Sequence, residues 1–581
     1  MAERPVECSL CKKSVKVTYK EIVGETVTVM ETCADCPILQ QKLHGGALAP
    51  QKEGGLKESL CCGNCRTTLE AIKTGNPLGC SECYAVFSDV LISDLSAANK
   101  IPTRITKKNP SIHIGKSPNK PLTIPSSSRL TALNEALNDA LKKENYEQAA
   151  WIRDQIKAIT EKGSNDGKSY TEMNSKVGNL ARRCPEFEPG EAGAEAAQLE
   201  QVERCRRVSN SVAADDAKNQ QVSSFRYKLP QAILDHLPWE KETNPIWLSS
   251  SFTLHRNLAR YFFPPKLDEK QMQQIASALK ESLLKSPLLK SPVLLKAEDT
   301  SVIDKEYLYE HYLNGDSFQN TLGGQGFIVD DSGKFMAQLN VGDHLQLQLI
   351  DCEGSWEKAW NQLNQMETEI GSTLDFAFSP KFGYLTSDPA ICGTGLIVQA
   401  HLHLPALIHT HQLQEALLKQ KEEGLTASGM GGSANEFVGD IVVISNAYTL
   451  GINEETIIHS VESLAMKLMA LEKTLRAHLQ HENNGEIKDQ VSRAFGLLLH
   501  SYQLQTKEAL DVLSLMKLAI NLDWVAGMTD AQINALFFQC RRAHLLHLLG
   551  EQQQSDLSEI ARKRAEFLHK HMQGVSLKFE T

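Results

Sequence analysis

Cysteine pairs with the spacing Cys-x-x-Cys dominate the start of this chain. Nine of its 14 cysteines precede residue 84, and eight of those nine form such pairs. The pairs make two quartets, which are Cys8, Cys11, Cys33 and Cys36, followed by Cys62, Cys65, Cys80 and Cys83. Two thiolates from each of two tight turns suit tetrahedral zinc and leave no open coordination position. We therefore predict two structural zinc ions within residues 1–95.

Two alternatives to this ligand assignment remain open at the level of sequence. Redox-active Cys-x-x-Cys pairs are one, although two complete quartets favour metal. The other concerns single ligands, because Cys61 adjoins Cys62 and His44 could replace a thiolate. The apolar content of residues 1–95 is too thin for an independent core, so we expect this region to unfold without metal.

A helical period begins after the cysteines, over residues 128–160. Its apolar residues recur every three or four positions in two stripes: Leu130, Leu133, Leu137 and Leu141, then Ala149, Ile152 and Ile156. Two short amphipathic helices joined by a tight turn are expected to fold back on each other. The words LNEALNDALKKENYEQAAWIRDQIKAI resemble the UvrB/UvrC motif, which implies protein–protein contact.

This motif and the second quartet together carry a larger resemblance. The segment LEAIKTGNPLGCSECYAVF, which spans that quartet's second pair, is similar to the bacterial protein arginine kinase activator, and so is the whole of residues 1–160. A generic adaptor built from zinc knots and a coil is the alternative.

Residues 229–581 resemble a different family. Four segments follow the order found in the phosphagen kinase catalytic domain, and they are most similar to the bacterial protein arginine kinase. These segments are WLSSSFTLHRNLARYFFPP, LNVGDHLQLQ, KFGYLTSDPAICGTGLIVQAHLHLPAL and SGMGGSANEFVGDIVVISNAYTLG. The expected architecture is thus multidomain: small zinc-binding knots, an α-helical hairpin, and a phosphagen-kinase-like α/β (α+β) fold with an antiparallel sheet and flanking helices.

The resemblance also says which side chains this chemistry needs. Transfer of the ATP γ-phosphoryl group depends on fixed cations that oppose the phosphates. The family supplies five arginines for this purpose, and their places are taken here by Ser251, Thr253, Gln346, Ile397 and Ser428. Arg256 survives in the first motif. It cannot rebuild the anion site alone.

The carboxylates that would orient the guanidinium acceptor are replaced as well. The family's Asn-Glu-Glu-Asp-His word is Asn340–His344 here, with Val341 and Gly342 in place of the glutamates. Asp388 stands where the family has a reactive cysteine, and Ser433 where it has a later glutamate. One transition-state arginine alone contributes roughly 10³–10⁵ in rate. We therefore predict no catalytic residues and no bound ATP or Mg²⁺.

The predicted function is a non-catalytic adaptor, a fused activator and arginine pseudokinase. The resemblance implies a partner in Clp-type protein quality control, through its unfoldase, or a kinase homologue, and a homo-oligomer is possible in this family. The main alternative is an active protein arginine kinase with a rearranged site, in which Lys334 or Lys381 supplies a compensating cation. A third reading is a different small ligand in the emptied cleft.

The elements that must position these residues follow from composition. Residues 96–127 and 161–228 have linker composition, and a helical stripe of Ile457, Ile458, Val461, Leu464 and Leu468 opens the last third. With 581 residues, several domains are expected. A net charge of −10 argues against nucleic acid, and the absence of a long apolar run or leader argues for a cytoplasmic protein without a membrane partner.

Overall fold

A computed structural model describes residues 17–23, 26–32, 60–103, 112–124, parts of 130–157, 229–239, 244–314, 323–420, 423–481, 484–550 and 556–579. Two compact units are present, Met1–Leu60 and Cys61–Thr581. In the first, strands β1 (Val17–Val23) and β2 (Thr26–Thr32) form an antiparallel hairpin. The first cysteine quartet, His44 and the predicted linker 161–228 lie outside the described residues.

The second cysteine quartet opens the larger unit. Three helices belong to this region: α3 (Leu69–Lys73) lies between the two cysteine pairs, α4 (Glu82–Val86) contains Cys83, and α5 (Ser88–Ala97) follows. Thr68 starts α3, because its side-chain oxygen accepts a hydrogen bond from the Ala71 amide at 3.2 Å. Further along the chain, residues 112–124 form neither helix nor strand. Ile112, Lys116 and Ile124 of this segment are buried.

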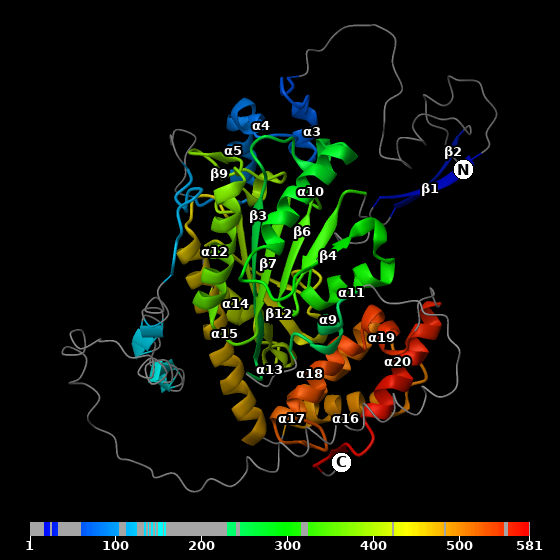
Figure 1. Ribbon diagram of the computed structural model, residues 1–581. Helices are drawn as coiled ribbons and strands as arrows, with labels where there is room; N and C mark the ends of the chain where they lie inside the picture. Colours follow the sequence, from blue (N-terminus) through cyan, green and yellow to red (C-terminus); the bar gives the residue numbers. More distant parts are fainter. Residues whose placement is uncertain are drawn as a thin grey trace. The chain divides into compact units, whose positions relative to one another are not determined.

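An eight-stranded antiparallel sheet forms the centre of this unit (Figure 1). Its strands, in spatial order, are β11 (Leu425–Gly429), β12 (Ile441–Asn446), β10 (Leu396–His403), β3 (Trp247–Arg256), β7 (Leu345–Asp351), β6 (Phe335–Leu339), β5 (Gly326–Val329) and β4 (Val293–Lys296). Two short strands, β8 (Phe378–Ser379) and β9 (Gly383–Tyr384), pair separately. The predicted antiparallel sheet with flanking helices is confirmed.

Each face of the sheet has its own hydrophobic core, because successive side chains of a strand point to opposite faces. On one face, Phe252 and Leu254 pack with α10 (Glu269–Leu284), α12 (Trp356–Thr373) and α15 (Glu454–His481). The short helices α13 (Pro405–His409) and α14 (Leu413–Lys419) join the same core. The predicted stripe from Ile457 to Leu468 lies in α15 and is buried here, as expected.

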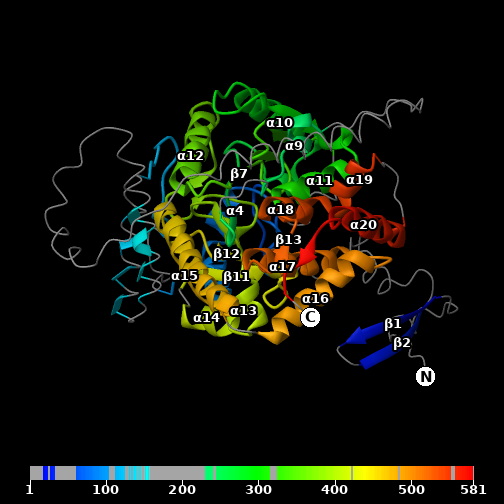
Figure 2. The same ribbon diagram turned by 90° about the horizontal axis from the view of Figure 1, so that it is seen from below.

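The opposite face is covered by α9 (Gln231–Asp235), α11 (Val302–Tyr312) and the C-terminal helices. These are α16 (Gly485–His500), α17 (Thr506–Asn521), α18 (Asp530–Gln539), α19 (Arg542–Leu548) and α20 (Leu557–His571), and the strands β13 (Val525–Ala526) and β14 (Ser576–Leu577) pair beside them. Figures 1 and 2 show α16–α20 gathered as a group, with α19 beside α11.

The described residues between 130 and 157 are helical, as the two stripes predict. Leu133, Ala149 and Ile152 are buried in a small cluster with Met466 of α15. Leu141, assigned to the first stripe, is instead 47% exposed. Among the residues that the structure describes, none of the helices combines the length and the apolarity needed to cross a membrane.

Candidate functional site

Five neighbouring strands bring four of the positions matched to family arginines together on one face of the sheet. Antiparallel register places Ile397 of β10 opposite Thr253 of β3, and His255 of β3 opposite Gln346 of β7. On the other side of β10, Ser428 of β11 pairs with Val443 of β12. Because alternate side chains of a strand point to the same face, side chains from these strands line one cavity. The lining residues from the sheet are Thr253, His255, Gln346, Ile397, Gln399, His401, Ser428 and Val443.

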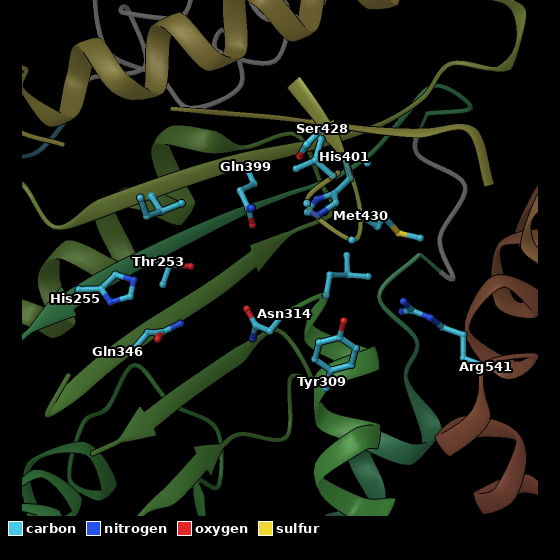
Figure 3. Close-up of a pocket in the computed structure, with 16 residues that line it drawn as sticks. Thr253, His255, Tyr309, Asn314, Gln346, Gln399, His401, Ser428, Met430 and Arg541 are labelled. Carbon is cyan, nitrogen blue, oxygen red and sulfur yellow. The ribbon is translucent and has the colours of Figure 1, made fainter. Parts of the chain in front are cut away.

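This cavity has a volume of about 430 Å³, and we call it the cleft. Its wall opposite the sheet comes from α11 and the residues after it, with Tyr309, Leu313 and Asn314. Loop residues 429–432 and Arg541, which precedes α19, complete the lining (Figure 3). The cleft therefore lies between the sheet and the C-terminal helices.

The charge of the cleft lining is low. Among the residues that line it, Arg541 alone is a lysine or arginine, and none is an aspartate or glutamate. Arg541 also donates to the backbone carbonyl of Glu310 at 3.0 Å. Burial lowers the pKa of the second histidine of the lining, His401, to about 4, so its ring is neutral at pH 7. A triphosphate carrying about four negative charges would meet one arginine here.

Four of the five positions that the resemblance matches to family arginines line this cleft. The fifth, Ser251, is buried beside it, where its hydroxyl donates to the Gln399 side-chain oxygen at 3.3 Å. Val341, Gly342, Asp388 and Ser433 are absent from the lining. Asp388 instead caps a turn, because its carboxylate accepts the Ala390 amide at 2.9 Å.

Arg256, the arginine retained in the first motif, is fully buried on the other side of β3. Its Nε donates to Oε1 of Glu367 at 2.7 Å, and its Nη1 donates to the carbonyls of His255 and Thr394 at 2.8 and 3.0 Å. The guanidinium also lies 3.5 Å from the centre of the Tyr384 ring. Arg256 therefore contributes no charge to the cleft lining.

Asp343 and His344 have separate hydrogen-bond partners. Asp343 faces His255, with 3.1 Å between its Oδ2 and the histidine Nδ1, and it accepts from the Asn257 side chain at 2.6 Å. Burial opposes ionisation of Asp343, but these hydrogen bonds lower its pKa below the ordinary value. His344 bridges two backbone groups, since Nδ1 accepts the Leu258 amide at 2.9 Å and Nε2 lies 2.8 Å from the Phe262 carbonyl. His344 thus serves the scaffold.

Two histidines of β10 and the two lysines named above, Lys334 and Lys381, also have defined partners or positions. His403 is buried, with Nε2 at 2.8 Å from the Ser514 hydroxyl, whereas His401 lines the cleft. Lys334 bonds Glu353 at 2.6 Å and Lys381 bonds the Ser88 hydroxyl at 2.8 Å. Neither lysine lines the cleft, so neither replaces the family arginines there.

The second cysteine quartet brings four potential metal ligands together. The sulfur atoms of Cys62, Cys65, Cys80 and Cys83 all lie within 4.8 Å of one another, and all four residues are buried. Across the quartet, Sγ of Cys62 is 3.7 Å from that of Cys80, and Sγ of Cys65 is 3.3 Å from that of Cys83. Four converging thiols fit tetrahedral zinc. It is the only such group of metal-binding side chains in the described part of the chain, and it excludes the exposed Cys61.

Thiol ionisation links this site to pH. Burial has the largest effect on the thiol pKa of both Cys80 and Cys65, and in each case it acts to raise it. The pKa of the Cys80 thiol rises to about 11. At Cys65, hydrogen bonds from Thr67 overcome burial and lower the pKa to about 7. Because zinc binds thiolates, metal binding must release protons from the less acidic thiols.

The zinc knot packs directly against the kinase-like part of the chain. Tyr84, one residue after the last ligand, donates its hydroxyl hydrogen to the Thr386 carbonyl at 2.9 Å. The Leu78 amide donates to the Ser387 carbonyl at 2.8 Å, and the Phe263 amide donates to the Gly79 carbonyl at 2.9 Å. The knot's apolar residues share a core with Phe263, Phe382 and Leu385. Sequence offered no sign of this contact.

Comparison with known proteins matches four regions of the chain to families. Residues 269–475 match the ATP:guanido phosphotransferase C-terminal catalytic domain, and residues 484–580 match the protein-arginine kinase McsB C-terminal domain. Residues 60–106 match the McsA central zinc-finger domain, and residues 127–162 match the UvrB/uvrC motif. Fold and site together thus define a phosphagen-kinase-type region joined to a zinc-finger region.

Relatives identify the family more closely. The chain is 36% identical over 354 residues to a protein-arginine kinase of Chlamydia pneumoniae, which covers 60% of this chain and 98% of that protein. It is 32% identical to the protein-arginine kinase of Halothermothrix orenii, over 56% of this chain and 92% of that one. A lombricine kinase crystal structure matches with a TM-score of 0.36 and 17% identity, over 43% of this chain and 73% of that one. The chain belongs to the protein-arginine kinase family, and it carries an McsA-like zinc-finger region in the same polypeptide.

Proposed function

We propose that this protein is a non-catalytic adaptor, in which a protein-arginine kinase fold has become a pseudokinase fused to its McsA-like region. The observation that carries this proposal is the charge of the cleft. Thr253, Gln346, Ile397 and Ser428 line it where the family has arginines, and Arg541 is the single arginine of the lining. The retained Arg256 is held in a buried ion pair away from it.

The energetics favour the loss of the reaction. A hydrogen bond to a charged group contributes about 1.5–3 kcal/mol, and one arginine that stabilises the transition state contributes roughly 10³–10⁵ in rate. Several such groups are replaced by neutral side chains, and the positions of the acceptor-binding glutamates hold Val341 and Gly342. His255, which contacts Asp343 at 3.1 Å, also lines the cleft. A histidine beside a carboxylate does not replace the several arginines that would oppose the phosphates.

The test separates this proposal from an active kinase. Isothermal titration of ATP with Mg²⁺ into the full chain should give no measurable heat, and labelled ATP should leave no phosphate on arginine side chains of an unfolded protein substrate. The protein-arginine kinase of Chlamydia pneumoniae, assayed in parallel, tests whether the conditions support the reaction. Micromolar ATP affinity together with arginine phosphorylation would make this chain an enzyme.

The adaptor half of the proposal rests on the helical hairpin. Leu133, Ala149 and Ile152 pack on Met466, but Leu141 and Tyr146 are 47% and 68% exposed. Exposed apolar and aromatic side chains on a hairpin are suited to a protein partner. We propose the Clp-type unfoldase as that partner, in a bacterial cytoplasm. Pull-down with the full chain should recover it, and Tyr146→Ala with Leu141→Ala should weaken the capture; equal recovery would remove this partner surface.

A further inference from the structure

Residues 112–124, which we call the strap, join the zinc knot to the rest of the chain by an unusual set of contacts. The strap has no secondary structure, so its backbone groups need partners elsewhere. Helix α12 supplies several of them. Asn361 accepts the Ile124 amide at 3.0 Å and donates to the Ile124 carbonyl at 3.1 Å. Trp360 and Asn364 both donate to the Leu122 carbonyl at 3.1 Å.

The centre of the strap is a buried lysine. Lys116 is 6% exposed, and its Nζ lies 2.5 Å from both Oε2 of Glu367 and Oδ1 of Asn364. The Lys116 amide donates to both carboxylate oxygens of Glu454, at 3.1 and 3.2 Å. One residue of the strap is therefore recognised through its side chain by α12 and through its backbone by the start of α15.

Charge explains why a lysine belongs here. Burial opposes ionisation of Glu367, but Arg256 and Lys116 together lower its pKa. Burial raises the pKa of Glu454, which has the same two cations nearby. Removing Lys116 would leave Arg256 as the single cation for two buried glutamates. An unpaired buried charge is strongly unfavourable.

The residues before Lys116 add shape selection. A Cβ atom at Gly115 would lie 2.8 Å from Thr394 Cγ2 and 2.9 Å from Glu454 Oε1, so a larger residue would need both groups to move. His113 fits against Gly383, where a Cβ would come within 2.4 Å of its Nδ1. The site thus selects a small residue followed directly by a lysine.

We propose that Glu367, Asn364 and Glu454 form a receptor for a glycine–lysine segment, and that the strap is its ligand within the same chain. In this arrangement the strap, with the zinc knot, locks the McsA-like region onto the kinase-like region. The same Glu367 carboxylate holds Arg256 on the side of β3 away from the cleft. This inference concerns recognition between the two regions and stands whether or not the cleft catalyses phosphoryl transfer.

Cutting the full chain between the two regions tests the proposal. A specific protease site would be introduced within 161–228, whose composition is that of a linker. After cleavage, association of the two fragments would be measured by analytical ultracentrifugation over a range of dilutions. The fragments should stay together at micromolar concentration. Lys116→Met should weaken their association by about 100-fold or more, because it removes one partner of a buried ion pair. Lys120→Met, at an exposed strap position, is the matched control and should change nothing.

A peptide of residues 108–124 gives a second measurement on the unsubstituted protein. Added in excess after cleavage, it should compete with the strap and promote dissociation of the fragments, whereas the same peptide with Met at position 116 should not. Because the peptide experiment uses the unsubstituted protein, it still tests the proposal if Lys116→Met impairs folding. Equal association of the Lys116→Met and Lys120→Met fragments, or equal competition by the two peptides, would overturn the proposal.

Discussion

Glu367 Oε1 lies 2.7 Å from Arg256 Nε, and the two side chains are 2% and 0% exposed. This pair holds Arg256 outside the lining of the cleft. Arg256 is on strand β3, whose neighbouring residues Thr253 and His255 line the cleft, but its guanidinium is bonded on the opposite face. Its role in this chain is therefore to neutralise a buried carboxylate and to fix the carbonyls of His255 and Thr394.

Replacing this arginine should destabilise the protein. Arg256→Met leaves Glu367 with Lys116 alone and two carbonyls without their donor. Breaking a buried pair typically costs about 3–5 kcal/mol of unfolding free energy. Urea unfolding followed by tryptophan fluorescence would measure the loss. Arg260→Met is the control, because its contact with Asp375 is exposed and such pairs contribute about 0–1 kcal/mol. Equal midpoints for the two variants would contradict the assignment.

Restoring positive charge to the cleft should restore nucleotide binding. The triple variant Gln346→Arg, Ile397→Arg and Ser428→Arg places three cations at positions that converge on one cavity. We expect ATP affinity to rise at least about tenfold, since each charged hydrogen bond contributes about 1.5–3 kcal/mol in favourable geometry. Titration calorimetry with ATP and Mg²⁺ would measure it.

The control for the restored cleft adds the same charge elsewhere. Gln273→Arg, Gln274→Arg and Gln412→Arg lie at exposed positions outside the cleft. This variant should bind ATP no better than the unsubstituted chain. Comparable gains in the two variants would mean that net charge, and not the cleft, attracts the nucleotide.

A single glycine beside the cysteines should control zinc retention. A Cβ at Gly79 would come within 2.7 Å of Cys65 Sγ and 2.8 Å of Lys266 Cγ, so Gly79→Ala must displace a ligand or the packed kinase-like region. Such overpacking costs about 1–3 kcal/mol. Gly63→Ala is the matched control, because nothing lies within 4 Å of its Cβ position. Competition with a chromogenic chelator should release zinc faster from the Gly79 variant only; identical release would contradict the site geometry.

Sequence could predict the features that depend on local pattern. The spacing of Cys62, Cys65, Cys80 and Cys83 indicated four converging ligands, and the structure brings these sulfur atoms together. The stripe beginning at Ile457 indicated a buried helix face, which α15 confirms. The family resemblance predicted that five replaced arginine positions share one site. Four of them line the cleft and Ser251 does not, and strand register explains why Thr253, Gln346 and Ile397 lie close together.

Contacts between distant segments could not be read in the same way. The composition of residues 96–127 is that of a linker, because prolines, serines and lysines form no periodic pattern, yet the strap inside it is fixed by side chains of α12 and α15. Arg541 also lines the cleft, although it lies far from the sheet residues in sequence. The residues next to it in sequence form no pattern that would predict its place in the cleft. His255 did carry a signal, since it alternates with Thr253 on the same strand.

Buried histidines should make the protein less stable as pH falls. Burial lowers the pKa of His401 to about 4 and that of His311 to about 3, whereas an unfolded histidine titrates near 6.5. Between the folded and the unfolded pKa values, the unfolded state binds more protons than the folded state. The unfolding free energy therefore decreases as the pH falls through this range. The expected slope is about 1.4 kcal/mol per pH unit for each such histidine. Full stability is expected above pH 6.5, and it should decline progressively toward pH 4.

Urea unfolding at pH 7.5, 6.0 and 5.0 would measure how the unfolding free energy decreases with pH. His401→Gln should reduce the slope of this decrease by at most the contribution of one histidine. Glutamine keeps a hydrogen-bonding side chain beside Ser249, whose hydroxyl lies 3.4 Å from His401 Nδ1, and it does not titrate. The exposed His500 gives the control, because His500→Gln should leave the slope as it is. If both variants kept the slope of the unsubstituted chain, the acid sensitivity would have to come from other buried groups, such as His311 against the Gly333 carbonyl.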